Sequence, residues 1–367
     1  MSLNDAHTFQ VGIVDWSGLE HLSRKLSESG IEPGTIQDSE WQIIEQALKH
    51  LVDHQDWEGI VRLRNLFNPL YAGDTVTGLA ALQRLDYHAL EAARCLGDKH
   101  ELGHLLGAKG HNLHRQGYHQ NAISAFDESA KNYWEIGEDF PALESYYMTA
   151  LCHRALGDRN KSKGILENVL NKIRPDDPWR ANPLQVMAWL IQDEGKLADS
   201  EKLLRQALIL YKNTENSDTL IVGALADLGE IVGILGRVQE SSELFEESLT
   251  VLSKYVGQYD RQEARVLLKY SELLVHQKDY NIAMKLLNRA DDKVSRYGHY
   301  YDLLWQIELA KAILFLQQGH ITNCFTKLRS VLRIRKHLGL SNVMLAQHVM
   351  ARYAQRLLKT KRLISNS

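Results

Sequence analysis

The chain has 367 residues, of which 44% are hydrophobic and 24% are charged, and this balance excludes an intrinsically disordered protein. Its three cysteines, Cys95, Cys152 and Cys324, are far apart in the sequence, which excludes a disulfide framework and a thiolate metal site of the CxxC kind. No apolar stretch approaches the roughly 18–20 residues that cross a bilayer, and residues 1–10 lack a basic-then-apolar signal layout, so we expect a cytoplasmic protein that does not enter a membrane.

The N-terminal part of the chain has the weakest helical pattern. Residues 1–37 contain Gly30 and Pro33-Gly34, which interrupt a helix, and we expect an irregular N-terminal cap there. Residues 38–98 are interpreted as degenerate helical repeats, in which two short helices flank Gln55 and a longer helix covers Val76–Leu96.

Residues 99–340 carry two interleaved sets of glycines with a step of about 40 residues. The first set marks tight turns within successive units, with Lys278 in place of glycine at the fifth position: Gly117, Gly157, Gly195, Gly236 and Gly319. The second set marks helix ends, where glycine supplies a left-handed residue, with Asp177 and Ser217 at the two positions between the second and third members: Gly97, Gly137, Gly257, Gly298 and Gly339. Two sets of glycines that share a spacing of about 40 residues predict a stack of helix pairs.

Small residues recur at fixed positions of both helices in each unit. About seven positions before the turn stand Gly110, Ala150, Ala188, Gly229, Ser271 and Ala312. Five positions after the turn stand Ala122, Ser162, Ser200, Ser241, Ala283 and Cys324. One helical turn later come the bulky residues Phe126, Leu166, Leu204, Phe245, Leu287 and Leu328. We expect the small residues to let the two helices approach closely and the bulky ones to fill the space between them.

These columns resemble the tetratricopeptide repeat, which has a small residue in its first helix, a turn glycine, then alanine and an aromatic residue in its second helix. The best match, GHNLHRQGYHQNAISAFDESA, begins at Gly110, and six units match over residues 99–340. The resemblance implies an all-α fold, a right-handed α-solenoid of helix-turn-helix repeats. Leucine mostly replaces the aromatic residue early in the first helix, and the step is nearer 40 than the family's usual 34 or so residues.

Units of this length, with turns at Gly97 and Gly157 that are each flanked by Leu and Asp, are similar to the sensor arms of bacterial signal-transducing ATPases. The sequence has no GxxxxGK[ST] phosphate loop, so the ATPase module has no counterpart in it. HExxH and GxSxG patterns and a glycine-rich dinucleotide turn do not occur either. We therefore expect no catalytic residues, no cofactor and no enzyme activity.

The resemblance also implies a binding groove, because solenoids of this kind commonly hold an extended peptide or a partner helix on the face lined by the first helices. Aromatic, amide and charged side chains on that face suit the recognition of a peptide backbone and its side chains. The predicted groove residues are His104, His111, His114, Arg115, Tyr147, Arg154, Gln185, Trp189, Gln192, Glu230, Arg265, Lys269 and Glu272.

Four histidines at helical spacing, His100, His104, His111 and His114, can share one stripe of a helix. Imidazoles one turn apart can chelate zinc or copper, or act as a switch that titrates near neutral pH. No cysteine or close carboxylate completes a metal shell in the sequence around them. A polar lining of the groove is therefore preferred, and no metal site is predicted.

The end of the chain is basic, because 11 basic and no acidic residues follow Glu308. We expect residues 341–367 to form a basic capping helix. The basic patch consists of Arg329, Arg333, Lys336, Arg352, Arg356 and Lys359. Its alternative roles are a solvated cap, self-association with the acidic body of a second copy, binding of an acidic partner and binding of nucleic acid. Nucleic acid is the least favoured, because the segment has few aromatic residues to stack on bases.

The leading functional hypothesis is a non-enzymatic protein-interaction scaffold or adaptor that binds a peptide segment or a partner helix in its groove. The alternative is a ligand- or peptide-gated signalling regulator of the same repeat type, in which occupancy of the groove changes the superhelix. A nucleic-acid-associated protein that uses the basic C-terminal end is the third hypothesis. The sequence does not identify the partner.

Overall fold

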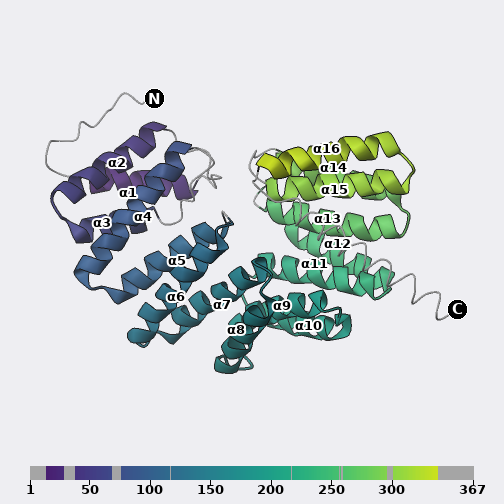
Figure 1. Ribbon diagram of the computed structural model, residues 1–367, viewed down its shortest axis with the longest axis horizontal. Helices are drawn as coiled ribbons and strands as arrows, with labels where there is room; N and C mark the ends of the chain where they lie inside the picture. Colours follow the sequence, from purple (N-terminus) through teal and green to yellow (C-terminus); the bar gives the residue numbers. More distant parts are fainter. Residues whose placement is uncertain are drawn as a thin grey trace. The chain divides into compact units, whose positions relative to one another are not determined.

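A computed structural model describes residues 14–28, 38–67, 76–295 and 301–337, apart from residues 116, 216, 256 and 258. The regular structure of these ranges is helical throughout and includes no strand. The chain divides into two compact units, Met1–Gly195 (unit 1) and Lys196–Ser367 (unit 2). Within each unit, helices that follow one another in the chain pack side by side from α2 onward (Figure 1). The expected all-α repeat architecture is confirmed.

Unit 1 contains the degenerate N-terminal helices and the first regular pairs. Its helices are α1 (Trp16–Glu28), α2 (Asp38–Asp53), α3 (Trp57–Leu66), α4 (Val76–Leu96), α5 (Lys99–Arg115), α6 (His119–Glu135), α7 (Asp139–Ala155), α8 (Arg159–Lys172), the 3₁₀ helix η1 (Pro178–Arg180) and α9 (Ala181–Asp193). Helix α1 lies within the segment for which the sequence predicted an irregular cap. It forms because Leu19 and Leu22 recur at helical spacing and bury themselves in one apolar cluster with residues of α2, α3 and α4.

Unit 2 continues the pattern of helix pairs. Its helices are α10 (Leu197–Lys212), α11 (Asp218–Ile234), α12 (Val238–Leu252), α13 (Asp260–His276), α14 (Tyr280–Ser295), α15 (Tyr301–Gln317) and α16 (Ile321–His337). We call the helices that precede the repeat turns A helices (α5, α7, α9, α11, α13 and α15) and the helices that follow these turns B helices (α6, α8, α10, α12, α14 and α16). Consecutive A helices within unit 2 also contact each other, α11 with α13 and α13 with α15.

The described helix-end glycines adopt the left-handed backbone predicted for them, with a φ of 67° at Gly97, 76° at Gly137 and 78° at Gly257, and the turn glycines adopt it too. The backbone angle φ at Gly117, Gly157, Gly195, Gly236 and Gly319 lies between 78° and 90°. Lys278 has a φ of 66° at the position where the sequence departs from glycine, and Gln55 has a φ of 52° in the turn between α2 and α3. Gly298 and Gly339 lie outside the described residues. Two non-glycine residues therefore adopt a conformation that usually costs an L-residue about 1–2 kcal/mol.

The small residues of both predicted columns are buried in the structure. A Cβ atom at Gly110 would lie 2.7 Å from the ring of Phe126, so these two helices are too close for any side chain at this position. Serines of the B-helix column also donate hydrogen bonds to A-helix carbonyls, from Ser162 to Ala150 at 2.8 Å and from Ser241 to Gly229 at 2.6 Å. These bonds satisfy buried hydroxyls while preserving the close approach. Leu328, half-buried on α16, is the exception among the bulky residues.

The predicted basic capping helix over residues 341–367 lies outside the described residues, and with it Arg352, Arg356 and Lys359. The boundaries proposed at residues 37, 98 and 340 stay predictions. No helix in the described part of the chain is both long and apolar enough to span a bilayer.

Candidate functional site

The predicted groove residues of unit 1 come from the A helices α5, α7 and α9, and two of them contact each other across neighbouring helices. The guanidinium carbon of Arg154 on α7 lies 4.9 Å from the ring centroid of Trp189 on α9. Both side chains are half-buried, so each still has a surface open to solvent. A contact of this kind contributes about 0.5–2 kcal/mol and holds a cation and an aromatic ring in fixed relative positions. Gln192, one helical turn after Trp189, is also half-buried.

Tyr147, the other aromatic residue of the predicted groove, packs mainly within its own repeat. Its ring lies 5.6 Å from the ring of Trp179, which also lies 5.3 Å from Phe140. Tyr147 borders an apolar cluster formed by Leu143, Val169 and Ile173. Burial, with the nearby charge of Glu144, raises the pKa of Tyr147. Tyr147 therefore contributes to the packing of α7 against its neighbours, in addition to its predicted place in the groove.

Trp179 packs against Tyr147 and Phe140 and is not among the predicted groove residues. It belongs to the short helix η1 in the connection between α8 and α9, and the side chain of Asp177 accepts a hydrogen bond from its backbone N–H at 2.9 Å. The signal in the sequence was the Asp177-Pro178 pair, because an acidic cap followed by proline is typical of a helix start.

The histidines predicted to form one stripe on α5 have separate partners in the structure. His100 Nδ1 lies 2.8 Å from a carboxylate oxygen of Glu138, and His104 Nδ1 lies 3.5 Å from one of Glu101. The ring of His111 meets the ring of Phe126 edge to face at 5.2 Å. The expectation that no carboxylate lies close to these histidines is corrected, since Glu138 lies beside His100 and Glu101 beside His104.

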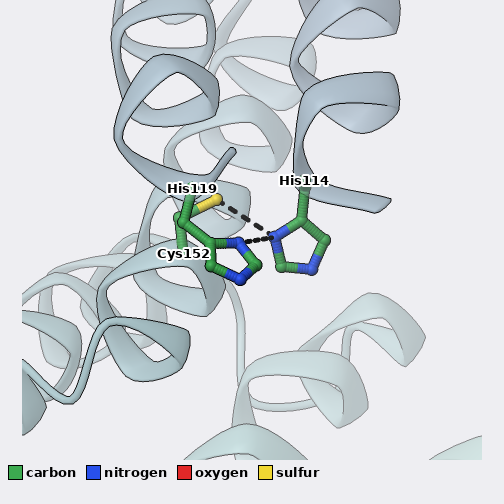
Figure 2. Close-up of side chains that lie close together, drawn as sticks. All are labelled: His114, His119 and Cys152. Atoms are coloured by element: carbon green, nitrogen blue, oxygen red, sulfur yellow. Dashed lines mark hydrogen bonds between the residues drawn. The ribbon is translucent and has the colours of Figure 1, made fainter. Parts of the chain in front are cut away.

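His114 meets two residues that the sequence did not associate with it (Figure 2). Its Nδ1 atom lies 3.2 Å from Nδ1 of His119, the first residue of α6, and 3.3 Å from Sγ of Cys152 on α7. The expectation that no cysteine joins the histidines is corrected, because the repeat places α7 beside the α5–α6 turn. These three residues form one group with potential metal ligands within 4.8 Å of one another.

The ionisation of this group follows from its burial. Burial and the neighbouring His119 and His111 lower the pKa of His114 to about 4, so its imidazole is neutral at pH 7. Burial also lowers the pKa of His119. Burial and the negative charge of Asp127 raise the pKa of the Cys152 thiol to about 12, so the free thiol is protonated at neutral pH.

In unit 2 the predicted groove residues Glu230 and Lys269 bind each other. Lys269 Nζ on α13 lies 2.6 Å from Asp227 and 2.7 Å from Glu230, both on α11. Asp227 is 5% exposed. Although burial alone would lower the pKa of Lys269, the two carboxylates raise it above its ordinary value. The cluster joins two A helices, and its charges are engaged within the protein.

The remaining predicted groove residues differ in exposure. Gln185 is buried within α9, whose described residues are apolar on most sides. Arg265 is exposed and Glu272 is half-buried, both on α13. Arg115 ends α5, and its side chain lies outside the described part of the structure.

Three residues of the predicted basic patch are described, and all three are exposed on α16: Arg329, Arg333 and Lys336. Two nearby cations are instead engaged within the protein. Lys327 Nζ lies 2.8 Å from Glu308, and the guanidinium of the buried Arg335 lies 4.7 Å from the ring centroid of Trp305. The exposed basic surface of α16 thus includes fewer cations than the composition of the segment indicates.

No protein-family model matches this chain, and no curated protein does. Solved structures match it in fold at low identity. A Rap protein complexed with Competence and Sporulation Factor is 13% identical, with a TM-score of 0.56 over 88% of this chain and 98% of that chain. NprR in complex with its cognate peptide NprX is 13% identical, with a TM-score of 0.56 over 96% of this chain and 97% of that chain.

Aspartyl phosphate phosphatase F from Bacillus subtilis is 12% identical, with a TM-score of 0.56 over 88% of this chain and 84% of that chain. At these identities the likeness concerns the fold, which is a helical repeat solenoid of the tetratricopeptide kind.

Proposed function

We propose that this chain is a non-enzymatic interaction scaffold that binds a peptide segment or a partner helix along its A helices. The observation that carries the proposal is the pair formed by Arg154 and Trp189 on neighbouring A helices, with the amide of Gln192 one turn further on. An aromatic face, a cation and an amide at one surface suit a peptide, because they pack on its side chains and form hydrogen bonds with its backbone.

A peptide-gated signalling regulator is the second candidate. It is supported by the Rap protein and NprR, which share this fold over most of the chain and were each solved with a bound factor or peptide. The resemblance to the sensor arms of signal-transducing ATPases points in the same direction and stays a prediction. Self-association and nucleic-acid binding through the basic end stay predictions as well.

The proposal can be tested by selecting binders from a display library of random peptides with the full-length protein as bait. The test variant is Arg154→Ala with Trp189→Ala. The matched control is Lys172→Ala with Trp134→Ala, because Lys172 Nζ lies 5.1 Å from the Trp134 ring and forms the same kind of pair on the B helices α8 and α6.

We expect selected peptides to bind the wild type and the B-helix control equally, and the A-helix variant at least about tenfold more weakly, because each truncated anchor costs about 1–2 kcal/mol. Calorimetry gives the affinities, and circular dichroism checks that both variants fold. Equal losses in the two variants, or none in the A-helix variant, would contradict the placement of the site.

The two candidate functions differ in the response of the protein to its peptide. A regulator should contract when a selected peptide binds, whereas a scaffold should keep its shape. Small-angle scattering of the full chain, with and without a saturating peptide, measures the radius of gyration. A change limited to the wild type and the B-helix control would favour the regulator.

A further inference from the structure

The group formed by His114, His119 and Cys152 brings three elements of adjacent repeats to one point. His114 ends the A helix α5, His119 begins the B helix α6, and Cys152 lies on the next A helix, α7. Figure 2 shows the two imidazole rings and the thiol directed toward one another. Chain positions that are 38 residues apart, His114 and Cys152, thus meet through tertiary packing alone.

The spacing of the three side chains resembles that of ligands around a tetrahedral ion. With Zn–N of about 2.0–2.1 Å and Zn–S of about 2.3 Å, two nitrogens stand about 3.4 Å apart, and nitrogen and sulfur about 3.6 Å apart. The corresponding distances here are 3.2 Å and 3.3 Å. The potential ligand atoms of the three residues all lie within 4.8 Å of one another. A small rotation of the half-buried His119 ring would therefore bring all three to bonding distance from one ion.

The surroundings of the group also suit a cation. Asp127, whose charge acts on Cys152, places a carboxylate near the group and accepts a hydrogen bond from Thr149 at 3.2 Å. His114 and His119 are half-buried, and Cys152 is fully buried.

We propose that His114, His119 and Cys152 form a three-ligand site for a borderline-soft divalent metal ion, with Zn²⁺ as the ion to be tested. Two imidazoles and one thiolate are ligands that zinc accepts and that calcium and magnesium avoid. On binding, the Cys152 thiol loses its proton to the buffer and the sulfur bonds to the metal. The ion would link α5, α6 and α7, and so join two adjacent repeats.

The experiment uses the full-length, tag-free protein after treatment with a chelator. Titration with ZnCl₂ by calorimetry measures affinity and stoichiometry, and titration with CoCl₂ detects a thiolate-to-metal absorption band. The test variants are His119→Ala and Cys152→Ala. The controls are His100→Ala, which removes another α5 histidine, and Cys324→Ala, which removes another buried thiol. These controls matter because the chain has 16 histidines that can bind zinc weakly.

We expect one tight Zn²⁺ per chain in the wild type and both controls, at least about tenfold weaker binding in both test variants, and a cobalt band that Cys152→Ala abolishes. Zinc should also raise the melting temperature of the wild type but not of His119→Ala. If the wild type binds zinc no more tightly than His119→Ala, or if its cobalt complex lacks the thiolate band, the three residues are a hydrogen-bonded group and the metal site is refuted. The cobalt band of the wild type decides this even if Cys152→Ala fails to fold.

Discussion

At the scale of single residues, the tight turns differ in how well their side chains suit a left-handed backbone. Gly236 has a φ of 90°, and a Cβ atom there would meet no atom within 4 Å, so the requirement for glycine is purely conformational. Lys278 occupies the equivalent turn of the next pair with a φ of 66°, and its side chain is exposed. Lysine at this position therefore carries a backbone cost that glycine avoids.

Lys278→Gly should stabilise the protein by about 0.5–1 kcal/mol, because relief of the left-handed strain exceeds the entropy that glycine loses on folding. Gly236→Ala is the reciprocal variant and should destabilise by about 1–2 kcal/mol. Urea unfolding followed by circular dichroism measures both changes. A loss of stability in Lys278→Gly would mean that the exposed lysine contributes more than its backbone costs.

At the scale of elements, helices α5 and α6 approach each other too closely for a side chain at the small-residue position of α5. Gly110 on α5 faces the buried ring of Phe126 on α6 with no space for a Cβ atom. Gly164 on α8 has the same helical backbone but open space around it, since a Cβ atom there would meet nothing within 4 Å. A substitution to alanine therefore changes both helix propensity and packing at Gly110, but only helix propensity at Gly164.

Gly110→Ala should destabilise unit 1 by about 1–3 kcal/mol, because the added methyl group forces α5 and α6 apart and this outweighs the better helix propensity of alanine. Gly164→Ala should instead stabilise by about 0.5–1 kcal/mol. The midpoint of thermal unfolding gives the sign of each effect. Stabilisation by both substitutions would show that Phe126 moves aside freely and that the close approach is not required.

At the scale of the whole molecule, the chain consists of two compact units, and its tryptophans are divided unevenly between them. Six of the seven tryptophans belong to unit 1, and Trp305 alone belongs to unit 2. In a repeat protein each pair is stabilised by itself and its neighbours, so a local loss of stability need not spread along the chain. Tryptophan fluorescence therefore reports mainly on unit 1, whereas circular dichroism reports on both units.

We expect Gly236→Ala in unit 2 to lower the urea midpoint seen by circular dichroism and to leave the fluorescence midpoint nearly unchanged. Gly110→Ala in unit 1 should lower the fluorescence midpoint. Both substitutions are measured in a Trp305→Phe background, which removes the reporter of unit 2. Equal shifts of both probes in both variants would show that the whole chain unfolds as one cooperative unit.

The sequence by itself determined the repeat length, the turn positions and the small-residue columns, including the departure at Lys278. These features depend on residues near one another in the chain, since helical periodicity and left-handed turns are local properties. Only the tertiary structure decided which side chains of different helices meet: Cys152 beside His114, Trp179 beside Tyr147, and Lys269 between Asp227 and Glu230. These contacts depend on how closely and at what angle successive helices pack, and no local sequence pattern specifies that packing.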